Sequence, residues 1–413
     1  MKILNFGSCN LDYVYTLDHI VTPGETESTD RYDVFAGGKG LNQSIAAAKA
    51  GAEVWHAGCV GRDGDMLLKM LSDSNVDVSF LDTVDSPNGH AVIQVSRRGE
   101  NSIFLYPGSN EMLTEEQIDR VISHFSAGDL LLVQNETNLV PEIVRKGRER
   151  GMKIVLNPSP YNEKIETIDF RCLSYLILNE VEGKAISGSD DPSECLAFLR
   201  NKYPDLTVVL TLGTQGCLLG DGEEKLFHPA YEVKAVDTTA AGDTFTGYFL
   251  ASVADGLPRV EALRRASCAS ALAVSRMGAA PSIPYKEEVL QALLELKPIL
   301  HRADPAEETR RLIRSYLEEH LKDASLQGLA ERLGYSAAYT GNLVKLRCGM
   351  PFSALLRQSR CSRCAKLLVE TDRSVEDIID SVGYKNESFF RKAFRERYGL
   401  SPRAYRKQMR GES

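Results

Sequence analysis

The chain has 413 residues, of which 43% are hydrophobic and 26% charged, and its formal net charge is −8. This length exceeds what one hydrophobic core usually serves, so two or three domains are expected. No apolar run approaches the roughly 18 residues that a membrane-spanning helix needs. No secretory signal sequence is evident, and together these features predict a soluble globular protein of the cytoplasm.

The nine cysteines are odd in number and scattered, which is typical of reduced thiols rather than of a disulfide framework. Only Cys361 and Cys364 form a CxxC pair. No second pair and no nearby His accompanies them, and apolar residues recur around them at helical spacing. We therefore interpret both as small core residues of a helix rather than as metal ligands.

The charge is distributed unevenly along the chain. Residues 1–302 hold 28 Lys and Arg against 42 Asp and Glu, a net charge of −14, whereas residues 303–413 hold 21 against 15, a net charge of +6. An acidic part followed by a basic part predicts two functional units. Two prolines, Pro298 and Pro305, bracket a polar stretch between helical patterns. We expect a first domain over residues 1–297, a linker over 298–305 and a second domain over 306–413.

The first domain alternates short apolar runs with helical patterns. The runs occupy residues 2–6, 54–59, 130–134, 154–157, 176–179 and 208–211. This alternation predicts an α/β fold, a doubly wound and mostly parallel sheet with helices on both faces. Residues 12–35 and 90–106 instead show the alternation and turn residues of antiparallel strands, which predict a small β lid.

A glycine-rich segment, Gly37-Gly38-Lys39-Gly40-Leu41-Asn42, leads into one of the predicted helices. Adjacent glycines let the backbone approach a ligand closely, Lys39 supplies a cation, and Asn42 offers both a hydrogen-bond donor and an acceptor. Taken alone, the segment fits a plain tight turn equally well.

A second segment of small residues, DTTAAGDTFTG at 237–247, follows an extended stretch and precedes an apolar helix. The backbone amides of Ala240, Ala241 and Gly242 at a helix N-terminus would bind a phosphate. Asp243 then stands in the first turn, where its carboxylate can accept the proton of an attacking hydroxyl. The alternative is that Asp243 only caps the helix. Capping does not require two alanines and a glycine in front of the Asp, so we favour the anion site.

Five segments in a fixed order resemble the PfkB family of sugar kinases, and its ribokinase group most closely. They are GGKGLN at 37–42, NPSP at 157–160, NEVE at 179–182, TLGTQG at 211–216 and DTTAAGDTF at 237–245. Each segment alone is a weak signal, but the ordered set, covering roughly residues 1–297, is specific. The resemblance implies a ribokinase-like fold and an enzyme that phosphorylates a pentose with ATP, most simply D-ribose to ribose 5-phosphate.

The resemblance also implies the roles of individual residues. Asp243 would be the base that deprotonates the sugar hydroxyl, and Ala240, Ala241 and Gly242 would form the anion hole for the phosphoryl group. Substrate contacts would come from Asp243, Asn10, Asp12, Gly38, Lys39, Asn42 and Glu136. Nucleotide contacts would come from Asn179, Thr211, Gly213, Gly216 and Gly242.

Two metal cofactors follow from the same resemblance, Mg²⁺ and a monovalent cation, which is K⁺ in this family. Glu182 would hold Mg²⁺ through water. The ligands of K⁺ would be oxygens of Asp237, Thr239, Ala273, Arg276, Gly278 and Ser282. The family resemblance also makes a homodimer the expected assembly.

The basic domain contains an internal repeat. LxxLAxxLGY at 326–335 is echoed by VxxIIxxVGY at 375–384, at an offset of 49 residues. Each copy predicts a short helix, a glycine turn and a second helix, which is the helix-turn-helix pattern. In the second copy Phe390, Ala393 and Phe394 share one helical face, and polar residues occupy the other. A solvated charged face is the alternative, which the duplication and the positive charge disfavour.

The repeat, a linker helix at 355–368 and the ending GLSPRAYR at 399–406 resemble the AraC-type DNA-binding domain, which implies double-stranded DNA as a partner. The groove-facing candidates in the first copy are Ala338, Tyr339, Asn342 and Lys345. Those in the second copy are Asn386, Glu387, Ser388, Arg391, Lys392 and Arg395. Thr340 and Val344 stand where the family prefers Leu and Phe, so we expect the first copy to pack or to read DNA less strongly.

Two interpretations of the whole chain stay open. In one it is a sugar kinase that also binds specific DNA sequences. In the other it is an AraC-type transcriptional regulator that uses the kinase fold mainly as a sugar sensor. The intact catalytic motifs favour the first interpretation.

Overall fold

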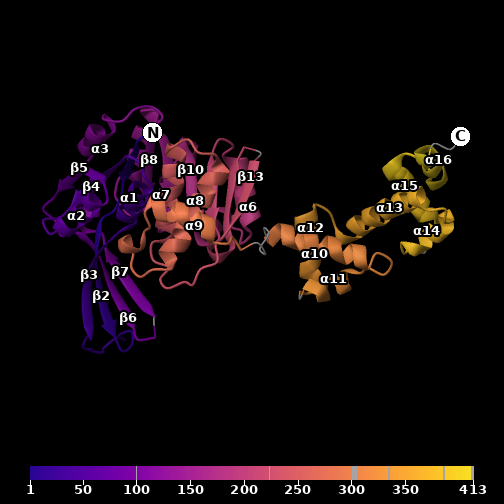
Figure 1. Ribbon diagram of the computed structural model, residues 1–413, viewed down its shortest axis with the longest axis horizontal. Helices are drawn as coiled ribbons and strands as arrows, with labels where there is room; N and C mark the ends of the chain where they lie inside the picture. Colours follow the sequence, from indigo (N-terminus) through magenta and orange to yellow (C-terminus); the bar gives the residue numbers. More distant parts are fainter. Residues whose placement is uncertain (99, 223, 300–304, 334, 385–386, 411–413) are drawn as a thin grey trace. The chain divides into compact units, whose positions relative to one another are not determined.

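The computed structural model describes residues 1–98, 100–222, 224–299, 305–333, 335–384 and 387–410. The chain divides into two units, Met1–Leu300 and His301–Ser413, whose elements are labelled in Figure 1. Among the described residues, none of the helices combines the length and the apolar character that crossing a lipid bilayer requires.

The described residues of the first unit form a nine-stranded sheet of order β13-β12-β11-β10-β9-β8-β1-β4-β5. Its strands are β1 (Ile3–Phe6), β4 (Val54–Val60), β5 (Val76–Thr83), β8 (Leu130–Gln134), β9 (Lys153–Asn157), β10 (Leu173–Asn179), β11 (Thr207–Thr211), β12 (Gly216–Asp221) and β13 (Glu224–Pro229). All neighbours pair in parallel except β11 with β12 and β12 with β13, which are antiparallel. The predicted doubly wound, mostly parallel sheet is confirmed.

Helices cover both faces of this sheet. On one side lie α1 (Lys39–Lys49), α2 (Asp65–Asp73), α7 (Ala241–Ala254), α8 (Arg259–Val274) and α9 (Lys286–Glu295). On the other lie α3 (Glu115–Ile122), α4 (Val140–Glu149) and α6 (Pro192–Lys202), while α5 (Glu180–Ser187) follows β10. Successive strand residues point to opposite faces, so Leu130 and Leu132 join the first core whereas Leu131 and Val133 join the second.

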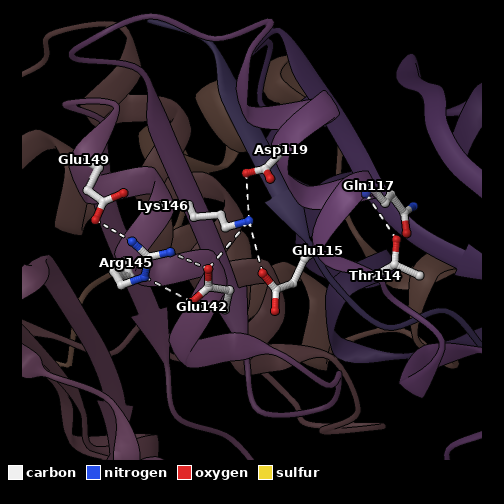
Figure 2. A network of polar contacts seen from close by, with 8 residues as sticks. All are labelled: Thr114, Glu115, Gln117, Asp119, Glu142, Arg145, Lys146 and Glu149. Atoms are coloured by element: carbon white, nitrogen blue, oxygen red, sulfur yellow. Dashed lines mark hydrogen bonds and ion pairs between the residues drawn. The ribbon is translucent and has the colours of Figure 1, made fainter.

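A network of charged side chains joins α3 to α4 (Figure 2). Lys146 Nζ lies 2.7 Å from a carboxylate oxygen of Asp119, 3.5 Å from one of Glu142 and 3.6 Å from one of Glu115. Arg145 pairs with Glu142 at 2.5 Å within α4. Because most of these carboxylates are exposed, each pair contributes at most about 1 kcal/mol.

The lid is a separate four-stranded sheet of order β3-β2-β6-β7 within the described residues. Its strands are β2 (Asn10–Leu17), β3 (Arg31–Gly37), β6 (Gly89–Ser96) and β7 (Asn101–Tyr106). The pairs β2/β3 and β6/β7 are antiparallel, as predicted, but the central pair β2/β6 is parallel. The parallel pair arises because α1, β4, α2 and β5 intervene between the two hairpins, so that β6 enters the lid in the same direction as β2.

The second unit is all-α in its described residues. Its helices are α10 (Pro305–Glu319), α11 (Leu326–Leu333), α12 (Ala337–Cys348), α13 (Phe352–Glu370), α14 (Val375–Ser381), α15 (Glu387–Tyr398) and α16 (Pro402–Arg410). The pairs α11–α12 and α14–α15 are the two predicted helix-turn-helix copies. Gly349 and Gly399 follow α12 and α15 with φ of 71° and 75°, a conformation that glycine adopts readily.

Each copy has its own hydrophobic core. Ile313, Leu329 and Val344 belong to the first core, and Phe390 and Phe394 belong to the second. The CxxC cysteines are also buried in the second core, as the sequence predicts.

Candidate active site

The candidate site lies where the direction of chain progression across the sheet reverses. From β1 the chain moves to β4 and β5 on one side, and from β8 it moves through β9, β10 and β11 on the other. At such a point the connections after adjacent strands diverge and leave room for a ligand beyond the carboxyl ends of the strands. Ser8 follows β1 and Glu136 follows β8, while Asn157, Asn179 and Thr211 are the last residues of the next three strands.

Asp243 occupies the first turn of α7 and is only 8% exposed. Its Oδ1 accepts a 2.9 Å hydrogen bond from Gln43 Nε2, and its Oδ2 accepts a 3.2 Å bond from Asn42 Nδ2. Both donors belong to α1, which packs against α7. The N-cap is Ala240 and no side chain caps this helix. The capping alternative for Asp243 is therefore wrong, and two amides of α1 orient its carboxylate.

The backbone before Asp243 forms an open cradle. Ala240 adopts a left-handed conformation with φ of 60°, which is strained for a residue other than glycine. A Cβ added to Gly242 would meet nothing within 4 Å. The Ala241 N–H donates a long 3.3 Å hydrogen bond to Thr238 O. The sequence predicts that this amide is available to a phosphate, whereas in the structure it already has a partner. A cavity of about 220 Å³, also lined by Lys39, faces this turn.

Sequence reasoning missed the buried amides behind Asp243. Gln43 Nε2 also donates to Asn157 Oδ1 at 2.9 Å, and Gln43 Oε1 accepts from Gln134 Nε2 at 2.8 Å. Gln134 donates in turn to Asn5 Oδ1 at 3.0 Å. Gln43 is fully buried, and a glutamine at a core position of a small-residue helix was the available signal. This network fixes the orientation of the catalytic candidate.

The start of the lid contributes Asn10. Its Oδ1 accepts a 2.7 Å hydrogen bond from Asn110 Nδ2, and Asn110 Oδ1 accepts one of 2.9 Å from the Cys9 N–H. A Cβ added to Gly89 would lie 2.0 Å from Asn110 Nδ2 and 2.5 Å from Asn10 Oδ1. Glycine at 89 therefore leaves the space in which the Asn10 amide is positioned.

Three predicted substrate residues carry interacting charges. Burial, and then the Glu136 carboxylate, raises the pKa of Asp12 to about 7. Glu136 accepts hydrogen bonds from Ser8 Oγ and, at 3.1 Å, from the Lys39 N–H, while its burial raises its own pKa. The Asp243 carboxylate contributes most to raising the pKa of Lys39, so its ammonium group stays charged. The structure thus places two carboxyl groups and a cation close enough to influence one another's charge.

A second cavity, of about 380 Å³, adjoins the first, and Thr211, Ala241 and Gly242 line both. The predicted nucleotide residues Gly213 and Gly216 line this larger cavity together with apolar side chains. Its size and apolar lining suit a flat aromatic base.

The predicted nucleotide residue Asn179 lines the smaller cavity with Glu182. These two residues form a capping box at the start of α5, with Asn179 Oδ1 accepting from the Glu182 N–H at 2.9 Å and Glu182 Oε2 accepting from the Asn179 N–H at 3.0 Å. Among the described residues, no three His, Cys, Asp or Glu side chains cluster closely enough to bind a metal directly.

The predicted cation ligands lie on two segments, residues 237–239 and 273–282. Asp237 accepts 2.9 Å hydrogen bonds from the Thr239 and Gly278 N–H groups, and the Gly278 bond joins the two segments. Although burial opposes the shift, a 2.7 Å hydrogen bond from the Thr239 hydroxyl and then these two N–H bonds lower the pKa of Asp237. The predicted ligand of Arg276 is its carbonyl oxygen, and its guanidinium group pairs with Glu288 at 2.6 Å. The remaining predicted ligands are Ala273 and Ser282. The Ala273 carbonyl accepts a hydrogen bond from the Arg276 N–H, and the Ser282 hydroxyl donates one to Ala279 O.

In the second unit, most predicted DNA contacts that the structure describes are exposed. Those on α12 are Tyr339, Asn342 and Lys345, and those on α15 are Glu387, Ser388, Lys392 and Arg395. Asn386 and the side chain of Ala338 lie outside the described residues. Arg391 is half-buried and pairs with Glu387 and, at 3.2 Å, with Glu376 of α14. Its charge is already partly neutralised within the unit.

Two profiles match the chain. Residues 1–286 match the pfkB family carbohydrate kinase profile, and residues 329–408 match a Helix-turn-helix domain. The chain therefore belongs to the pfkB family of carbohydrate kinases and carries an AraC-type helix-turn-helix domain after the kinase unit. The sequence-based assignment of a sugar kinase is confirmed.

Ribokinases are among the most similar relatives. That of Haemophilus influenzae is 34% identical over 301 residues, covering 70% of this chain and 96% of that protein. The solved ribokinase of Thermotoga maritima is 34% identical with a TM-score of 0.64, covering 71% of this chain and all of that one. The Arabidopsis thaliana ribokinase, solved with ribose and ATP, is 28% identical with a TM-score of 0.62, covering 71% and 98%.

Proposed function

We propose that the kinase unit transfers the γ-phosphoryl group of ATP to a pentose, D-ribose giving ribose 5-phosphate, and that the second unit binds specific sequences of double-stranded DNA. The observation that carries the kinase proposal is the Asp243 carboxylate, held by Asn42 and Gln43 at the helix N-terminus beside two adjoining cavities. The similarity to ribokinases supports the choice of ribose.

In this proposal Asp243 accepts the proton of the sugar's primary hydroxyl. The hydroxyl oxygen bonds to the γ-phosphorus of ATP as the bond between that phosphorus and the ADP oxygen breaks. The amides of Ala240 and Gly242 and the Lys39 ammonium group stabilise the charge on the transferred group. Buried Asn42 Oδ1 has no partner among the described residues, so it is available to accept a sugar hydroxyl. Hydrogen bonds to a buried acceptor of this kind favour a polyol over an apolar ligand.

The remaining polar residues divide between sugar and cofactors. Asn10, Asp12, Gly38 and Glu136 complete the sugar site. Nucleotide binding falls to Asn179, Thr211, Gly213 and Gly216. Mg²⁺, held through water by Glu182, would neutralise phosphate charge. K⁺ would be held by oxygens of the segments joined by the bond between Asp237 and Gly278, since such hard cations prefer oxygen ligands.

A panel of pentoses and hexoses tests the substrate. Purified full-length protein is incubated with each sugar, ATP, Mg²⁺ and K⁺, and ADP release and the phosphorylated product are measured. Ribose should give the highest kcat/KM, and omission of either cation should lower it. Another sugar with a higher kcat/KM would correct the substrate, and no sugar-dependent ADP release would refute the enzyme and leave the sensor interpretation.

DNA binding is supported by the two helix-turn-helix copies and by the exposed cations of α15. Footprinting on the DNA upstream of its own gene tests this part of the proposal. Protection of a defined sequence is expected. Protection that does not exceed that of unrelated DNA would contradict specific binding.

We also propose a homodimer formed through the lid. Strand β7 lies at the edge of the lid sheet, and Ile103, Phe104, Leu105 and Tyr106 are each about half exposed. An edge strand with consecutive apolar side chains is suited to pairing with a second copy. Light scattering should give twice the chain mass, and Phe104→Ser should lower it. A monomeric wild type would contradict the proposal.

A further inference from the structure

The segment that leads from the kinase unit to the second unit forms part of the nucleotide cavity. After α9 ends at Glu295, residues 297–299 run antiparallel to residues 230–232. The Ile299 N–H donates to Ala230 O at 2.8 Å, and the Glu232 N–H donates to Lys297 O at 3.2 Å. Ile299 lines the 380 Å³ cavity together with residues 230–233 of the opposite segment.

Residues 297–299, which we call the strip, lie beyond the part of the chain that matches the kinase profile, which ends at residue 286. Its attachment is slight, because two backbone hydrogen bonds join it to residues 230–232 and Pro298 and Ile299 are only half-buried. Single hydrogen bonds of this kind contribute little net stability, since water competes for both groups. Contact with a ligand in the cavity would therefore shift the equilibrium between a strip that is bonded to residues 230–232 and a strip that is detached from them.

We propose that nucleotide binding in the kinase unit and attachment of residues 297–299 are thermodynamically coupled, so that ADP or ATP is an effector of DNA binding by the second unit. This inference rests on the nucleotide and DNA sites proposed above. A nucleotide base in the cavity covers the Ile299 side chain only when the strip is attached. It therefore binds the attached form more tightly, and by reciprocity the attached strip raises nucleotide affinity.

Attachment also changes the connection between the units. Detachment releases residues 296–299 from the kinase unit and so lengthens the connection that leads to α10, which begins at Pro305. Each residue adds at most about 3.5 Å of reach. A shorter connection restricts the positions that the second unit can take, and such restriction alters binding affinity without any new contact.

The test uses full-length protein with ADP as the probe. ADP should slow hydrogen–deuterium exchange of the peptide containing Ile299 at least threefold. Ile299→Ala, which removes the side-chain contact, should weaken ADP binding about fivefold, whereas the matched control Leu294→Ala on the exposed face of α9 should not. Ile299→Pro, which removes the N–H donor, should weaken ADP binding further and speed exchange.

DNA affinity is measured on the duplex upstream of its own gene with and without ADP. A change of at least threefold is expected for the wild type and Leu294→Ala, and none for Ile299→Pro. An unchanged DNA affinity overturns the effector role. Equal ADP affinity in wild type and both Ile299 variants overturns the coupling while the kinase proposal stands. Failure of the wild type to bind ADP refutes the proposed nucleotide site itself.

Discussion

Lowering the pH from 8 to 6 should weaken binding of the sugar about tenfold. Burial, and then the Glu136 carboxylate, raises the pKa of Asp12 to about 7. A sugar hydroxyl donates its hydrogen bond to the carboxylate, so binding favours the ionised form. With this pKa the ionised fraction falls from about 0.9 at pH 8 to about 0.1 at pH 6. The KM for the sugar should rise by the same factor of about ten.

Initial rates against ribose concentration at saturating ATP, at pH 6, 7 and 8, measure this effect. Glu136→Gln removes the neighbouring charge, which lowers the pKa of Asp12, and should move the rise in KM to lower pH. Asp18→Asn, which changes an exposed carboxylate directly after β2, is the matched control and should keep the wild-type profile. A wild-type KM that is constant between pH 6 and 8 would refute the role of the Asp12 carboxylate in sugar binding.

Three further changes have defined outcomes. Gly89→Ala places a methyl group 2.5 Å from Asn10 Oδ1 and should lower kcat/KM for the sugar at least about tenfold. Circular dichroism should show that the fold is retained, and an unchanged kcat/KM would contradict the role of Asn10. Thr340→Val removes a fully buried hydroxyl that lacks a partner among the described residues and should raise the free energy of unfolding in urea by about 1 kcal/mol, whereas destabilisation would contradict this. Replacing Lys392 and Arg395 together by Ala should reduce the salt dependence of DNA binding by about two counterions, and an unaltered slope would exclude them from the interface.

The strands that the sequence predicts well are those buried on both faces. The apolar residues 130–133 follow one another without interruption, and the predicted strand 130–134 matches β8 at both ends. Strands β5, β12 and β13 were not predicted. Strands β5 and β13 lie at the two edges of the sheet and mix apolar with exposed polar residues, and β12, beside β13, is a short apolar run bounded by glycines. The parallel pairing of β2 with β6 depends on the path of the intervening chain, which no local pattern encodes.

The residues of the candidate site could likewise be predicted only in part from the sequence. The motifs located Asp243 and the small residues before it, because their chemistry is local. The role of Gln43 depends on contacts with Asn157 and Asp243, which lie 114 and 200 residues away in sequence, and only folding brings these groups together. The ion pair of Arg391 with Glu376 could not be predicted either, because Glu376 lies on the preceding helix.

Sugar-dependent turnover of two matched variants tests whether Asp243 is the catalytic base. Asp243 and Asp255 lie at the two ends of α7, and Asn replaces each in turn in the full-length chain. With ribose, ATP, Mg²⁺ and K⁺, the wild type and Asp255→Asn should release ADP only when sugar is present. Asp243→Asn should reduce kcat by about 10²- to 10⁴-fold, the range for loss of a general base. Turnover by Asp243→Asn equal to that of the wild type would contradict the account.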